Sequence, residues 1–210
     1  AVMLKIWITG PHASGKTSLG TPLASKYHLP FIRETARDEL TEIQRSKEMA
    51  EAPKLEAMRA RLDEYDDFQR TVFKRQLAAE AAHPDGFLSD RALWDIPIYA
   101  GLWSTCAADM MESEEFRAYL AQFPKTTDKV FDPTRIVLFV SPEPEMLKED
   151  GTRERPTLRG VDQYYGAVEL FLAQHRIRHV PITTPHQRKR LALASEVIDR
   201  ALLWQAKSVI

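Results

Sequence analysis

Short apolar runs alternate along the chain with longer segments in which apolar residues recur every three or four positions. The runs predict buried strands, and the periodic segments predict helices with one face in the core. The predicted strands cover residues 3–9, 29–34, 87–89, 135–140 and 177–182. The predicted helices cover residues 16–27, 36–49, 53–82, 112–123, 162–175 and 187–207, with a further helix beyond Arg91. Strands that alternate with helices are typical of βαβ units, so the sequence predicts an α/β fold with a five-stranded parallel sheet.

The first predicted helix carries two residues that disfavour helices. Gly20 and Pro22 lie inside it, and Pro22 removes one backbone hydrogen bond, so we expect a kink or an irregular turn there. Pro53 stands instead at the first turn of the long helix over 53–82, where proline is favoured. The basic residues of that helix form either a solvated face or the border of a polyanionic ligand.

The segment Gly10-Pro11-His12-Ala13-Ser14-Gly15-Lys16-Thr17 has the spacing G-x-x-x-x-G-K-T of the P-loop, between a predicted strand and a predicted helix. Its glycines let the backbone bend around a phosphate, and the helix brings its positive end to the same anion. Lys16 would reach the outer phosphates of a nucleoside triphosphate, and the Thr17 hydroxyl would ligate Mg²⁺. The candidate nucleotide-binding residues are Gly10, His12, Ala13, Ser14, Gly15, Lys16, Thr17 and Ser18.

Polar residues follow the second and third predicted strands. Because ligands of parallel sheets collect at the carboxyl ends of the strands, Glu34, Asp90 and Arg91 are expected at the same rim as the P-loop. Asp90 would hold Mg²⁺ directly or through water, or else cap the helix from Ala92 onward. Arg91 suits a phosphate or an acceptor, and the alternative is a surface arginine.

A polar, irregular segment after the fourth strand carries three arginines within seven residues, Arg153, Arg155 and Arg159. Its low apolar content is typical of a mobile cover, a lid at about 149–161 that closes over the triphosphate. The alternative is a solvated loop.

Glu34 distinguishes between two kinds of phosphoryl acceptor. A hydroxyl must lose its proton, so its kinase benefits from a carboxylate within reach, whereas a phosphate acceptor needs arginines. Glu34 therefore favours a hydroxyl acceptor, unless it only pairs with Arg37 or Arg91.

Composition limits the remaining possibilities. The 210 residues, with 44% hydrophobic and 28% charged residues, predict a single domain over 1–210. The formal charge of −1 gives no sign of nucleic-acid binding. Cys106 is the only cysteine, which fits a reducing compartment, and no apolar stretch approaches the ~20 residues of a membrane span. With no signal peptide visible at the start, we expect a cytoplasmic location and no membrane partner.

Four segments together resemble the P-loop kinase family that includes the nicotinamide riboside kinase domain: Gly10 to Thr17, Glu34-Thr35-Ala36-Arg37, Asp90-Arg91 with Asp95 and Tyr99, and Asp150-Gly151-Thr152-Arg153. The chain is more loosely similar to deoxynucleoside and nucleoside monophosphate kinases. The resemblance implies a three-layer fold with the P-loop strand central, an arginine-bearing lid, ATP, Mg²⁺ and a small nucleoside-type acceptor. It also implies that Thr183-Thr184-Pro185-His186 holds adenine.

The resemblance assigns roles to the candidate residues. The implied catalytic residues are Lys16, Glu34 as the base, Asp90 and Arg153. The implied acceptor-binding residues are Glu34, Arg37, Arg91, Asp95 and Arg159, and Arg155 would contact the nucleotide. The implied metal ligands are Thr17 and Asp90. Gly20 and Pro22 depart from the family pattern.

Other functions fit parts of the same pattern. Related viral kinases phosphorylate hydroxymethylated pyrimidines such as 5-hydroxymethyluracil within DNA, which would place the protein in a host cytoplasm. The basic residues of 59–75 or Arg188-Lys189-Arg190 would then contact the DNA backbone. A nucleoside monophosphate kinase and a regulatory P-loop ATPase are further alternatives, whereas the absence of an Asn-Lys-x-Asp motif disfavours a GTPase.

Overall fold

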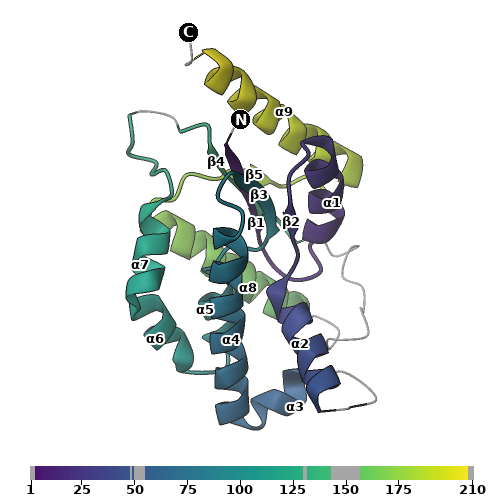
Figure 1. Ribbon diagram of the computed structural model, residues 1–210, viewed down its shortest axis with the longest axis vertical. Coiled ribbons are helices and arrows are strands. Elements are labelled where there is room, and N and C mark those ends of the chain that lie inside the picture. The colour runs from purple at the N-terminus through teal and green to yellow at the C-terminus, as the bar shows by residue number, and fades with distance from the viewer. Residues whose placement is uncertain (1–2, 48, 50–54, 130–131, 143–156, 208–210) are drawn as a thin grey trace.

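The fold consists of a parallel sheet between layers of helices (Figure 1), and the computed structural model describes residues 3–47, 49, 55–129, 132–142 and 157–207. The strands are β1 (Leu4–Thr9), β2 (Phe31–Ile32), β3 (Gly86–Asp90), β4 (Arg135–Val140) and β5 (Val180–Ile182). The helices are α1 (Lys16–Lys26), α2 (Thr35–Ser46), α3 (Leu55–Arg59), α4 (Leu62–Ala81), α5 (Asp95–Ala100), α6 (Cys106–Glu112), α7 (Glu114–Ala121), α8 (Leu158–Gln174) and α9 (Gln187–Lys207).

The strand order is β2-β3-β1-β4-β5, and every neighbouring pair is parallel. The predicted α/β fold with a five-stranded parallel sheet and a central P-loop strand is therefore confirmed. Since β1 lies between β3 and β4, the segments that follow these three strands emerge side by side at one edge of the sheet.

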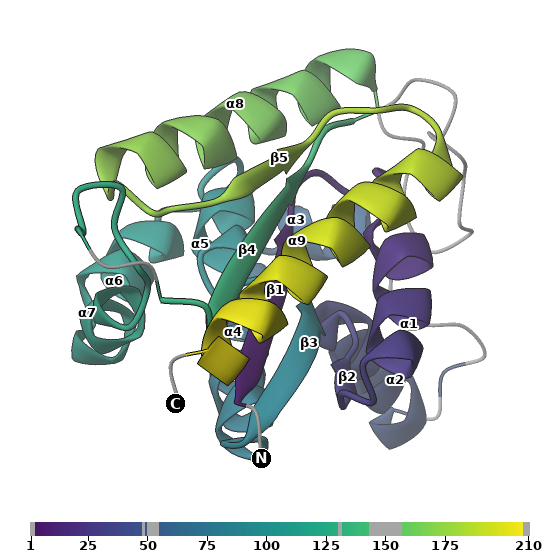
Figure 2. The ribbon, with the colours of Figure 1, turned by 90° about the horizontal axis from the view of Figure 1, so that it is seen from above.

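Alternation along the strands produces a core on each face of the sheet. Ile6 and Ile8 of β1 belong to the core that α1 and α9 cover, whereas Trp7 packs with residues of α4, α5, α7 and α8 on the other face. In Figure 2, α9 crosses in front of β1 and β4, and α8 lies beyond β5. Side chains on both faces are buried, which explains why the strands are almost continuously apolar.

Gly20 has a packing role in α1. A Cβ added there would lie 2.7 Å from the ring of Phe31, so glycine lets the helix approach the sheet closely. Pro22 also lies inside α1, but the helix continues without a break from Lys16 to Lys26. The irregular turn expected at Pro22 does not form.

Several predicted boundaries are wrong. The long helix predicted over 53–82 is divided in its described part, because Arg61 adopts a non-helical conformation (φ −124°, ψ 84°) and a new helix starts at Leu62. The helix predicted over 112–123 is shorter, α7 from Glu114 to Ala121, since Ser113 leaves the helical region and its hydroxyl accepts the Phe116 N–H as the cap of α7; Glu112 is instead the last residue of α6, which was not predicted. Strands β2 and β5 are shorter than predicted. Within the described residues, no helix has both the length and the apolar character needed to cross a membrane.

A buried polar network lies between the sheet and α4. The Glu80 carboxylate accepts hydrogen bonds from Trp7 Nε1 (3.0 Å), Gln76 Nε2 (2.8 Å) and the Tyr119 hydroxyl (3.0 Å). Gln76 also contacts Ser89 (3.0 Å). Burial raises the pKa of Glu80 from 4.5 to about 7, although the three donors oppose this shift.

The raised pKa of Glu80 predicts a pH-dependent stability. Between about pH 4.5 and 7 the folded state holds a proton that the unfolded state has released, so the free energy of unfolding should fall as pH rises through this window, by up to about 3 kcal/mol. Glu80→Gln should remove this contribution, which urea unfolding of both proteins from pH 4.5 to 8 will measure. Parallel pH profiles for the two proteins would contradict the expectation.

Candidate functional site

The loop between β1 and α1 has the backbone shape that binds phosphate. Gly10 has a φ of 141°, and a Cβ there would lie 2.4 Å from the carbonyl oxygen of Val140, so only glycine fits beside β4. Gly15 (φ 81°) precedes the first residue of α1, and Ala13 also has a positive φ of 57°. Thr17 and Ser18 are exposed on the first turn of the helix. The loop therefore presents the backbone N–H groups and the helix N-terminus that a phosphate requires.

The side chain of Lys16 is buried beneath this loop. Its Nζ donates to the carbonyl oxygen of Pro11 at 2.5 Å. Burial, followed by the positive charge of Arg91, lowers the pKa of Lys16 from 10.5 to about 8, while Asp90 and other carboxylates oppose the shift. A bound polyphosphate would favour the charged form again.

Thr17 and Asp90, the predicted metal ligands, lie together. The Thr17 hydroxyl donates to Asp90 Oδ2, which brings an α1 oxygen against the carboxylate that ends β3. A hydroxyl and a carboxylate are hard oxygen donors of the kind that Mg²⁺ prefers, so this pair fits the implied ion. The alternative role of Asp90 as a helix cap is wrong, because the Ala92 N–H is bonded by Asp95 Oδ2 at 2.8 Å.

Glu34 forms ion pairs with both of its candidate partners. Its Oε1 lies 2.8 Å from Arg91 Nε, and its Oε2 lies 3.3 Å from Arg37 Nε. The Arg91 side chain is 10% exposed, whereas that of Arg37 is 51% exposed. Arg91 also has a φ of 124°, which residues with a Cβ rarely adopt. The Arg91 interaction is the more firmly held of the two, and Arg91 is not a surface arginine.

Asp95 connects three parts of the rim. Its Oδ1 accepts the hydroxyl of Thr9, which ends β1, at 2.8 Å, and that of Tyr164 on α8 at 2.6 Å. The family resemblance implied Asp95 as an acceptor-binding residue, but nothing in the sequence indicated that Tyr164 contacts it, because a tyrosine on a helix face is typical of core packing.

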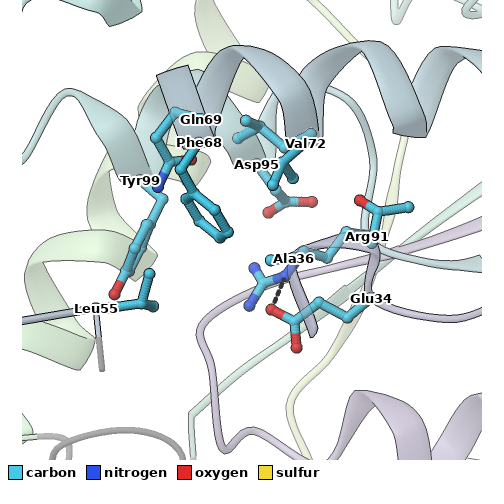
Figure 3. A pocket seen from close by; sticks show the side chains of 11 residues that line it. Glu34, Ala36, Leu55, Phe68, Gln69, Val72, Arg91, Asp95 and Tyr99 are labelled. Carbon is cyan, nitrogen blue, oxygen red and sulfur yellow. Dashed lines mark hydrogen bonds and ion pairs between the residues drawn. The ribbon is translucent and has the colours of Figure 1, made fainter. Parts of the chain in front are cut away.

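A narrow cavity of about 30 Å³ lies beside Glu34 (Figure 3). Glu34, Arg91 and Asp95 form its charged end, and Leu55 and Tyr99 lie at the opposite end. The remaining lining residues are Thr35, Ala36, Phe68, Gln69, Val72 and Ile96. The volume holds two or three water molecules, so a larger ligand must displace part of the wall. Among the helices that contribute to the wall, the shortest is α3, and Leu55 is its first residue.

Of the three arginines in the predicted lid, the structure describes only Arg159. Arg153 and Arg155 lie outside the described residues, as does most of 149–161. Arg159 does not lie in an irregular loop, because Thr157 caps α8 through the Gly160 N–H (3.1 Å). Arg159 is therefore an exposed residue in the first turn of α8.

His12 of the P-loop makes an edge-to-face contact with Tyr99, with ring centroids 6.1 Å apart.

The part of the cavity wall that α4 contributes was not predicted. Phe68 and Gln69 follow the same spacing that fills a core, so no sequence signal distinguishes a cavity wall from core packing there. Gln69 is 3% exposed, and it lines the cavity. A buried amide of this kind is available to a ligand.

Comparison with known proteins agrees with this geometry. The model of a family described as "AAA domain" matches residues 5–189. The solved structure of NadR protein in complex with NR is similar over 95% of this chain, with a TM-score of 0.65 and 18% identity, and this chain spans 52% of the NadR chain. Deoxyadenosine kinase from M. mycoides with bound dATP is similar over 93% of this chain and 100% of its own (TM-score 0.60, 14% identity). Shikimate kinase from Acinetobacter baumannii in complex with shikimate is similar over 95% of this chain and 93% of its own (0.50, 14%). No curated relative matches significantly. At these identities the likeness concerns the fold, and the chain has the three-layer fold of the P-loop kinases.

Proposed function

This chain belongs to the AAA domain family, and we propose that it is an ATP-dependent kinase that transfers the γ-phosphoryl group to a hydroxyl of a nucleoside-type acceptor. Two of the proteins with similar folds are kinases by name, and their structures were solved with dATP or with shikimate. Their common fold supports a kinase that acts on a small molecule.

The carboxylate of Glu34 is the observation that carries the hydroxyl acceptor. It faces the cavity at the carboxyl end of β2, and Arg91 fixes its Oε1. The exposed Arg37 holds the other oxygen more weakly, at 3.3 Å, so an incoming hydroxyl can replace that contact. Glu34 can then accept the hydroxyl proton as the nucleophile attacks.

The other rim residues suit the remaining tasks of phosphoryl transfer. Lys16 would bind the outer phosphates, and Thr17 with Asp90 would hold the Mg²⁺ that neutralises their charge when bound. Arg91 would orient Glu34 and offset its charge. Arg153 and Arg155 stay predicted lid residues that close over the triphosphate.

Several of the basic side chains that could contact DNA are already paired or buried, which favours a free small molecule over modified DNA. Arg61, Arg70 and Arg75 each lie within 3.2 Å of a carboxylate oxygen, from Glu64, Asp109 and Glu39 respectively. Arg190, another candidate for DNA contact, is fully buried. A buried cation cannot reach a phosphate backbone, and a paired one must first leave its carboxylate partner.

The buried amide of Gln69 suits an acceptor with an amide-like edge, such as a nucleobase, because it offers one acceptor and two donors. Gln69→Leu keeps the volume but removes this pairing, so it should raise the acceptor KM by about 10–100-fold. The KM for ATP should change little. Steady-state kinetics will measure both constants, with Gln174→Leu on the exposed end of α8 as the control. An unchanged acceptor KM would remove Gln69 from acceptor recognition.

Transfer from labelled ATP to a panel of acceptors tests the proposed function. The panel contains nucleosides, nucleoside monophosphates, nicotinamide riboside and DNA with 5-hydroxymethyluracil. Label on a free nucleoside-type hydroxyl, insensitive to salt, is the expected result. Transfer only to DNA, with steep salt dependence, would favour the viral DNA kinase. Hydrolysis that no acceptor accelerates would favour a regulatory ATPase.

A further inference from the structure

Arg190, in the first turn of α9, contacts three segments that are far apart in the sequence. Its side chain is fully buried. Nη1 donates to the carbonyl oxygen of Ser14 at 2.5 Å, Nε donates to that of Thr184 at 2.6 Å, and Nη2 donates to that of Ser141 at 3.1 Å. One guanidinium therefore joins the P-loop, the residue after β4 and the loop after β5.

Arginine is the residue type that this arrangement requires. Its guanidinium carries five N–H donors in a rigid plane, so its three nitrogens can each bond one carbonyl in a fixed direction. Lysine keeps the charge but offers one nitrogen on a flexible stem. Because burying a cation is costly, a fully buried guanidinium is expected to have a specific task.

The strand order indicates what the three segments have in common. The phosphates of a nucleotide would lie on the P-loop after the central β1, and the acceptor cavity lies on the β3 and β2 side. The nucleoside part of the donor would then bind at the β4 and β5 side of the same edge. Ser141 follows β4 there, and Thr184 lies in the loop after β5. Figure 2 shows the start of α9 beside α1, at the end of the segment that follows β5. Arg190 lies where the two halves of the donor site meet.

We propose that Arg190 is a positioning residue that holds the phosphate-binding loop and the nucleoside-binding side of the donor site in one geometry. The proposal rests on the proposed ATP site. When the phosphate site and the nucleoside site are already held at the right distance, ATP binds more tightly than its two parts do separately. Binding of the phosphates then brings the nucleoside to its own site, and no part of the protein has to become ordered first. The guanidinium also places a positive charge behind the P-loop, next to Ser14.

The test compares whole and divided ligands by titration calorimetry. ATP, adenosine and inorganic tripolyphosphate are titrated into the wild type, Arg190→Met, Arg190→Lys and the control Arg188→Met, whose residue is exposed in the same helical turn. The product of the two fragment Kd values divided by the Kd of ATP measures the gain from joining them. This ratio should fall about 10–100-fold in Arg190→Met and in Arg190→Lys, and stay unchanged in Arg188→Met. Arg190→Lys should regain tripolyphosphate affinity, because it retains the charge.

The outcomes separate the alternatives. An unchanged ratio in both Arg190 variants would overturn the positioning role, and so would full rescue of the ratio by lysine, which would leave only a charge effect. If Arg190→Met fails to fold, Arg190→Lys carries the comparison, with circular dichroism as the check on its structure. A wild type that binds none of the three ligands would overturn the proposed ATP site itself, and the inference with it.

Discussion

Replacing Lys16 by alanine is expected to lower the rate of phosphoryl transfer by about 10²–10³ while the protein stays folded. The loss follows from the position of Lys16 at the first residue of α1, where its amine can leave Pro11 and neutralise the charge that develops on the outer phosphates. The fold should tolerate the change, because burial lowers the pKa of Lys16 to about 8 and the charged amine is therefore a cost to the folded state.

The measurement pairs steady-state transfer with thermal unfolding. Lys26→Ala is the matched control, since Lys26 lies on the same helix, is half exposed and forms a surface ion pair with Asp199 at 3.3 Å. The control should keep its activity, and both variants should unfold near the wild-type temperature. A folded Lys16→Ala variant with full activity would remove the kinase proposal.

The order of strands and helices, and much of the rim, are predictable from local signals. Short, almost continuous apolar runs predict the strands, and the P-loop spacing predicts the place of Gly10 and Lys16. The rule that ligands gather at the carboxyl ends of parallel strands then correctly brings Glu34 and Asp90 to the same edge. These inferences succeed because each depends on a short stretch of chain.

The remaining features depend on tertiary packing, which a local pattern does not record. Arg190 reads as part of a basic surface run with its two neighbours, and only the packing of α9 against β4 and β5 buries it. Gln69 reads as one polar position on an amphipathic helix, although the docking of α3 makes it a cavity wall. The break at Arg61 has a weak signal, the acidic Asp63 and Glu64 of a new first turn, which the unbroken apolar spacing hid.

Glu34 also shows why proximity alone does not decide a role. The position of Glu34 is compatible with both interpretations of the residue, since it lines the cavity and also pairs with Arg91 and Arg37. A carboxylate held by a buried arginine is oriented for proton transfer, but it can also serve structure alone. Only a substitution that keeps its shape separates the two.

Glu34→Gln is that substitution, and the chemical step should fall by about 10²–10⁴ with the affinity for ATP nearly unchanged. The amide keeps the size of the side chain and an oxygen that can accept from Arg91 Nε, but it cannot take a proton from the acceptor. Single-turnover transfer measures the chemical step apart from binding.

Two further variants make the result specific. Glu39 of α2 is a second largely buried carboxylate, and it pairs with Arg75 at 2.7 Å. Glu39→Gln therefore controls for the loss of a nearby charge and should keep nearly full activity. Arg37→Gln removes only the exposed partner of Glu34, so it should have a small effect if the acceptor hydroxyl replaces that contact. An undiminished Glu34→Gln enzyme would show that no proton needs to be removed at this position. The acceptor would then be a phosphate, and Arg91 and Arg37 would be its ligands. Glu34 would pair with these two arginines only until the phosphate binds.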